Sequence, residues 1–159
     1  MSNKTVDEIQ KSYQYTIDPL DDLSTALIEY SLLFGKFIFL LKQYKFNENI
    51  MELKKKIQMK KEKIEKNKLE SLDKTLKEIS DECKRIDQQA RLDFHEISSM
   101  LTAITNDYKH NKNKPGAAEI YVKISSDIID KEASKYIQYE KKLILYNDLI
   151  IDIKKNLDN

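Results

Sequence analysis

The sequence predicts an all-α protein, an elongated antiparallel bundle of three helices with coiled-coil packing, over residues 18–159. The chain of 159 residues has two glycines and two prolines, while 35% of its residues are charged and 40% are hydrophobic. This composition is typical of long helices, because Gly and Pro mark turns. Apolar residues also recur at helical spacing over most of the chain. The segment HNKNKPG, residues 110–116, contains one proline and one glycine and marks the clearest break.

The first helix is predicted over about residues 18–64, with a kink or a short break at residues 47–49. Asp18 can cap the free amides, and Pro19 suits the first helical position. Residues 1–17 show no sustained period, so we expect a flexible N-terminal lead before the bundle.

Between residues 26 and 46, apolar side chains fall on almost every face of the first helix. Two neighbouring helices cannot cover a helix that is apolar all round, so we predict that this segment also forms a dimer interface. Gly35 within it costs about 1 kcal/mol relative to Ala. It is either a tolerated defect or, in the interpretation we prefer, the mark of a close helix crossing. The predicted interface residues are Leu27, Tyr30, Leu33, Phe34, Phe37, Leu40, Leu41 and Tyr44.

Residues 54–68 form a lysine-rich segment, with eight lysines against two glutamates and therefore a net charge of +6, although the whole chain is only +1. We predict that these lysines bind anionic lipid. They are Lys54, Lys55, Lys56, Lys60, Lys61, Lys63, Lys66 and Lys68. The alternative is a solvated helix face with i,i+4 pairs such as Glu62–Lys66 and Lys61–Glu65. Nucleic acid is not favoured as a partner, because the segment has no arginine and no interleaved aromatic residue.

A hairpin is predicted near residues 65–69. A seven-residue series of isoleucines begins at Ile50 and ends at Ile64, and Ser71 stands where its next member would fall. The rival interpretation is one straight helix over residues 49–110.

The second helix is predicted over about residues 70–110 and the third over about 118–158. Three segments of similar length joined by short turns describe an antiparallel bundle. The sequence allows two interpretations of residues 110–116, a reversal of the chain or a loop inserted in one helix.

The sequence contains no constellation that predicts catalysis, a metal site or a cofactor. Cys83, His95 and His110 lie far apart, so they do not form a metal-ligand set. The lone cysteine excludes an internal disulfide and suits a reducing compartment. The first residues are polar and do not resemble a signal peptide. Glu29 and Lys36 interrupt the apolar stretch, so no membrane span is predicted. We therefore expect a non-enzymatic cytoplasmic protein.

Several stretches resemble the membrane-remodelling BAR domain of the sorting nexins. The run DPLDDLSTALIEYSLLFGKFIFLLKQYK, followed by a lysine-rich helix, is similar to the family's dimer core and basic arm. RLDFHEISSML is similar to its mid-helix stretch, and SKYIQYEKKLILYNDLI to its closing helix. The resemblance covers roughly residues 18–150. It implies a crescent-shaped dimer with residues of about 26–44 at its centre and the lysines of 54–68 towards the arm ends, facing anionic lipid.

The resemblance further implies the family's roles in coating endosomal tubules and in partnering retromer-type cargo complexes. The leading prediction is therefore a homo- or heterodimeric, curvature-sensing module bound peripherally to endosomal membrane through its lysines. The alternative is a helical scaffold subunit of a multiprotein complex, whose first helix docks on a protein partner and whose lysines only confer solubility.

Overall fold

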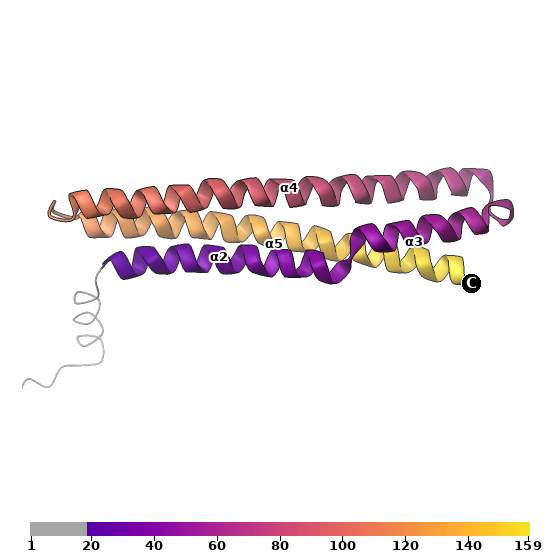
Figure 1. The fold of residues 1–159 in the computed structure, drawn as a ribbon, viewed down its shortest axis with the longest axis horizontal. Helices are drawn as coiled ribbons and strands as arrows, with labels where there is room; N and C mark the ends of the chain where they lie inside the picture. The colour runs from indigo at the N-terminus through magenta and orange to yellow at the C-terminus, as the bar shows by residue number, and fades with distance from the viewer. Residues whose placement is uncertain (1–18) are drawn as a thin grey trace, which may run out of the picture.

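The computed structural model describes residues 19–159, and these form helices joined by short turns. The elements are α2 (Pro19–Tyr44), α3 (Phe46–Met59), the 3-10 helix η1 (Lys61–Lys63), α4 (Lys66–Asn111) and α5 (Ala117–Asp158). No strand occurs among these residues, which confirms the all-α prediction. Figure 1 shows α2 and α3 following each other along one side of an elongated bundle, parallel to α5 and antiparallel to α4. The predicted N-terminal lead lies outside the described residues.

Within the described residues α2 begins at Pro19, and the first helical segment is interrupted at Lys45; the predicted cap, Asp18, lies outside the described residues. Two aspartates, Asp21 and Asp22, lie in the first turn of α2, where the helix dipole favours negative charge. Lys45 adopts the left-handed conformation, with φ 48° and ψ 50°. The Asn49 side-chain amide donates a hydrogen bond of 2.8 Å to the carbonyl of Tyr44, one of the acceptors that a helix end leaves free. The break therefore lies slightly before the predicted position, and Asn49 supports it.

The chain reverses between Met59 and Lys66, a few residues before the predicted hairpin. Ile64 is extended, with φ −101° and ψ 131°, and it packs against the core as a half-buried side chain. The first helical segment consequently ends at Met59 rather than near residue 64. The rival interpretation, one straight helix over 49–110, is wrong.

The HNKNKPG segment is a second reversal of the chain and not a loop inserted in one helix (Figure 1). Gly116 has φ 73° at the start of α5, a conformation that residues with a Cβ rarely adopt. Beside the turn, the Tyr121 hydroxyl donates a 2.7 Å hydrogen bond to Asp107, which ties the two helices together.

One hydrophobic core runs along the bundle, and each helix contributes a stripe at the spacing expected for a helix face. Among its most buried members are Tyr30, Phe37, Leu53, Leu76, Ile79, Ile86, Leu101, Tyr136 and Leu143. A smaller cluster of Leu23, Tyr108 and Ala117 closes the end of the bundle near the second turn.

Candidate functional site

The predicted lysines gather at one end of the bundle, where α3 ends, η1 turns and α4 begins. Six of them are exposed and form no ion pair within the described part of the chain. These six are Lys54, Lys55, Lys61, Lys63, Lys66 and Lys68. Their ammonium groups are therefore free to meet an anionic partner.

The other two lysines hold the hairpin to α5. The Lys56 ammonium lies 3.3 Å from a carboxylate oxygen of Asp158 and 3.8 Å from one of Glu52. The Lys60 ammonium donates to the backbone carbonyl of Leu157, in the last turn of α5, where basic side chains commonly satisfy free carbonyls. Lys56 and Lys60 thus have structural partners.

The i,i+4 ion pairs that would make the segment a self-neutralised helix face are not formed. Because α3 ends at Met59, Lys61 and Glu65 do not lie on one α-helix, and neither do Glu62 and Lys66. Both glutamates are exposed. These four side chains of the hairpin therefore form no ion pair within the described residues.

An open pocket of about 490 Å³ lies beside the hairpin, between the start of α4 and the end of α5. Lys60, Lys63 and Lys68 contribute its basic groups and Glu65 its acidic one. Its apolar lining consists of Ile64, Leu72, Ile153 and Leu157. The lysine end therefore combines positive charge with accessible apolar surface.

Met59 adds to this apolar surface at the tip of the hairpin. It is the last residue of α3, and 85% of its surface is exposed. Lys60 and Lys61 follow it directly and Lys56 precedes it by three residues, so the lysine-rich end also exposes a flexible apolar side chain.

Two of the eight residues of the predicted dimer interface require correction. Tyr30 and Phe37 are fully buried within the chain itself, so they have no surface left for a second subunit. The other six residues are half-buried and pack against the same core; they are Leu27, Leu33, Phe34, Leu40, Leu41 and Tyr44. All eight predicted residues therefore pack in the core of this chain, and the six half-buried ones keep part of their surface exposed.

A different apolar stripe covers the outer face of α2. Ile28, Leu32 and Phe39 remain 60%, 67% and 64% exposed, and their spacing of four, then seven residues places them on one face. Gly35 lies in the same stripe, and a Cβ there would meet nothing within 4 Å. The predicted close crossing at Gly35 therefore does not occur within the chain.

The apolar character of this region extends along α2 and α3. Over Pro19–Met59 an 18-residue window reaches a mean hydropathy of 1.5, enough by length and composition for a membrane span, and 22% of the window is buried. Core helices of soluble proteins meet the same criterion, and the inner face of α2 packs in the core here.

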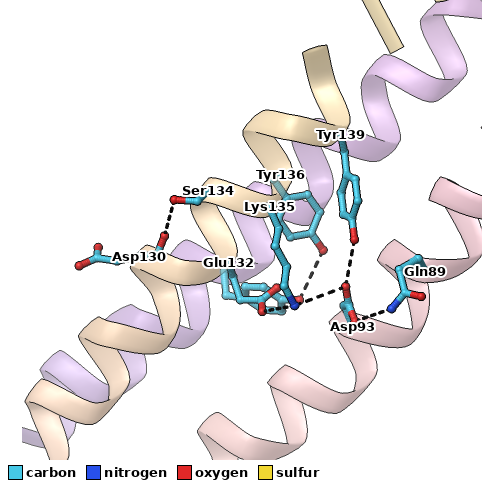
Figure 2. A network of polar contacts seen from close by, with 9 residues as sticks. Gln89, Asp93, Asp130, Glu132, Ser134, Lys135, Tyr136 and Tyr139 are labelled. Atoms are coloured by element: carbon cyan, nitrogen blue, oxygen red, sulfur yellow. Dashed lines mark hydrogen bonds and ion pairs between the residues drawn. The ribbon is translucent and has the colours of Figure 1, made fainter. Parts of the chain in front are cut away.

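A cluster of polar side chains lies between the helices at the level of α2, around the two buried acids Asp93 and Glu132. Asp93 on α4 accepts hydrogen bonds from Gln89 at 2.9 Å and from the Tyr139 hydroxyl at 3.3 Å. Figure 2 shows the Lys135 side chain reaching between Glu132 and Asp93. Its ammonium lies 3.1 Å from Glu132 and 4.0 Å from Asp93.

The side chains of this cluster stabilise the packing of the helices. The hydroxyls of Tyr30 and Tyr136 are 3.4 Å apart. Burial raises the pKa of Tyr136 to about 12 and that of Tyr30 further still, so both phenols stay protonated. The hydrogen bond that the Lys135 ammonium donates to the Glu132 carboxylate raises the pKa of Lys135. These groups hold α2, α4 and α5 together.

Sequence reasoning missed the two buried acids, Asp93 and Glu132. Both occupy inward positions in otherwise apolar helix stripes: Glu132 falls between Ile129 and Tyr136, and Asp93 follows Ala90. The alternating three- and four-residue spacing of a helix seam, counted from Ile129 to Tyr136, would have placed Glu132 inside.

We compared the chain with family models, curated proteins and solved structures, and none of the three comparisons gave a match.

Proposed function

We propose that this protein is a non-enzymatic helical module that binds anionic membrane surfaces peripherally through its lysine-rich hairpin end. The observation that carries the proposal is the set of six exposed, unpaired lysines on the tip that also presents Met59. Lysine suits a diffuse anionic surface better than a single planar ligand, because its ammonium is a mobile point charge.

The expected strength of this binding follows from the free charges. Six free lysines against Glu62 and Glu65 leave a net charge of +4 at the tip. At about 1 kcal/mol per charge near an acidic leaflet, one tip contributes about 4 kcal/mol, equivalent to a dissociation constant of about 1 mM. Binding through one tip is weak and sensitive to salt. An assembly with two tips binds more tightly through effective concentration.

Vesicle co-sedimentation tests the proposal. We expect the protein to sediment with vesicles that contain phosphatidylserine, at low salt, and to stay in solution with phosphatidylcholine alone or at high salt. Reversing charge at Lys61, Lys63 and Lys66 should abolish sedimentation. The matched control carries the same reversal at three exposed lysines of the other end, Lys109, Lys112 and Lys114. Unchanged sedimentation of the hairpin variant would refute the proposal.

Substitution of Met59 tests whether the tip of the hairpin is the surface that contacts the membrane. Burying a methionine side chain contributes about 1.5–3 kcal/mol, so Met59→Ser should weaken vesicle binding about tenfold or more. Met51→Ser is the matched control, because Met51 is also exposed on α3 but lies about two turns from the tip. Equal effects of the two variants would place the contact elsewhere on the molecule.

The resemblance to the BAR domain supports a more specific proposal: a dimer that senses curvature on endosomal membrane. Its support is the resemblance described in the sequence and the position of the turn between α3 and α4 at one extremity of an elongated bundle (Figure 1). Binding that increases on smaller vesicles of the same composition would support curvature sensing.

The exposed apolar stripe of α2 favours a second candidate function, a helical scaffold subunit of a protein complex. In that case Ile28, Leu32 and Phe39 would contact a protein, and the lysines would only confer solubility. Charge reversal at the hairpin distinguishes the two candidates, because it would leave a protein complex through α2 intact while abolishing lipid binding.

A further inference from the structure

We propose that the outer face of α2 is a self-docking surface, on which α2 of a second copy of this chain lies in the antiparallel direction. The inference goes beyond the lipid-binding proposal and does not depend on the lysine end. It rests on the apolar stripe that the chain leaves uncovered, on the position of Gly35 within that stripe, and on the charges at its two ends.

The stripe is self-complementary when two copies are paired antiparallel. If the pairing is centred between residues 33 and 34, Leu32 of each copy faces Gly35 of the other, and Ile28 faces Phe39. A glycine leaves a hollow in a helix surface, and the space above Gly35 is open. The leucine of one copy can therefore fill the hollow of the other, twice by symmetry, as an isologous interface requires.

The charges at the ends of α2 match the same orientation. Asp21 and Asp22 lie in its first turn, Lys42 lies in its last turn, and Lys45 follows at the break. All four are exposed and form no ion pair within the described residues. Antiparallel pairing brings the acidic end of each α2 to the basic end of its partner, whereas parallel pairing would bring like charges together.

The neighbouring helix widens the apolar patch. The Lys36 ammonium lies 3.5 Å from Glu140 on α5. Leu32 lies four residues before Lys36 and Phe39 three residues after it, so both flank Lys36 on the same face of α2. On α5, Glu140 is flanked in the same way by Ile137 and Ile144. Both isoleucines are exposed.

The size of the patch suits an interface. Its apolar side chains expose on the order of 500 Å² together, a large part of the ~800 Å² per partner that a stable interface buries. Contiguous apolar patches of this size commonly mark contact sites.

Antiparallel pairing also separates the lysine ends. From the centre of the pairing to Lys61 the chain advances through about 27 residues, or ~40 Å at 1.5 Å per residue. The two basic tips would then lie ~80 Å apart, at opposite extremities, where their mutual repulsion is fully screened. Parallel pairing would place them side by side.

Molar mass in solution tests the self-docking directly. At tens of micromolar, light scattering should give twice the 18.8 kDa mass of one chain. Leu32→Lys should give a monomer, and Leu92→Lys should remain a dimer. Leu92 is the matched control, because it is an equally exposed leucine (66%) on α4. A monomeric wild type, or equal masses for the two variants, would overturn the proposal.

Disulfide trapping tests the orientation. The double variant Ile28→Cys/Phe39→Cys should form a covalent dimer on oxidation, while Ile28→Cys alone should not. The native Cys83 is buried and does not compete. Cross-linking of the single variant would indicate parallel pairing and refute the antiparallel arrangement.

Gly35→Leu tests the hollow, because the monomer and the dimer should respond in opposite directions. Leucine favours helix more than glycine does and meets no neighbour within the chain, so the dilute monomer should melt at a higher temperature. The dimer should dissociate with a constant at least tenfold larger. A dimer of unchanged or greater strength would contradict the facing of Leu32 and Gly35. All three measurements are made without lipid, so their failure is separable from failure of vesicle binding.

Discussion

The helices α2 and α3 pack against the same two neighbours, α4 and α5, but their outer faces differ. Both bury an apolar stripe: α2 buries Tyr30 and Phe37, and the buried side chains of α3 are all apolar. Outside, α2 presents isoleucine, leucine and phenylalanine, whereas α3 exposes Lys54 and Lys55 together with two methionines, Met51 and Met59. The bundle requires only the inner stripes. The outer residues are therefore free to serve contacts with other molecules, of different kinds in the two helices.

The largest expected effect separates the two faces of α2. Phe37→Ala should lower the free energy of unfolding by about 3–5 kcal/mol, because Phe37 is fully buried with its ring 5.8 Å from that of Tyr136. Phe39→Ala should change it by no more than about 0.5 kcal/mol. Urea unfolding at low protein concentration measures both. Similar costs at both positions would mean that the outer face is covered, and the comparison would fail.

A smaller effect is expected from the polar cluster at the level of α2. Lys135→Met removes the ion-pair partner of Glu132, which is only 2% exposed. Breaking a fully buried pair costs about 3–5 kcal/mol. Since the Lys135 side chain is 40% exposed, solvent screening should reduce this to about 2 kcal/mol.

A double-mutant cycle shows whether this loss reflects the pair itself. Adding Glu132→Gln to Lys135→Met should recover most of the lost stability, because the uncompensated charge is then removed. If the double variant were as unstable as the single one, packing of the Lys135 stem would explain the loss instead.

The smallest expected effect lies at the junction of α2 and α3. Lys45→Gly should raise the free energy of unfolding by up to about 1 kcal/mol, since the left-handed conformation costs a residue with a Cβ about 1–2 kcal/mol and the added chain entropy of glycine offsets part of this gain. Lys42→Gly, three residues earlier and helical, should lower it by about 1 kcal/mol. Thermal unfolding of the two variants should therefore shift in opposite directions.

The parts of the fold marked by local chemistry could be predicted from the sequence. Pro19 and the Pro115-Gly116 pair act through their own backbone preferences, and the helices begin or reverse at both. The first reversal has no such marker, because Met59 to Lys66 contains neither Gly nor Pro. Its position depends on distant contacts, such as that of Lys60 with Leu157.

Which residues of the first helical segment face the core also depends on a feature that the sequence does not mark. The series Tyr30, Phe37 and Tyr44 would place Met51 inside a continuous helix. The left-handed residue at position 45 shifts the phase, so Ile50 is buried and Met51 is 60% exposed. The seven-residue series of isoleucines that begins at Ile50 indicates the new phase, but periodicity does not identify the left-handed residue that produces it.

The candidate sites were only partly visible in the sequence. The lysine run is a local feature, but the structural engagement of Lys56 and Lys60 depends on α5. That α2 is too apolar for two neighbours to cover was a correct expectation, since Leu32 and Phe39 remain exposed. Which stripe stays outside depends on the packing of the aromatic rings, for example Phe34 against Phe94 at 4.2 Å.

The contact between Lys60 and the last turn of α5 has a practical consequence for anyone who labels this protein. It brings Asn159 beside the hairpin, as Figure 1 also shows. A fluorescent protein or an affinity tag fused after Asn159 would emerge next to the lysines and shield them from a vesicle. A small dye placed on the 112–116 turn, at the far end of the bundle, would report on the same event without obstructing it.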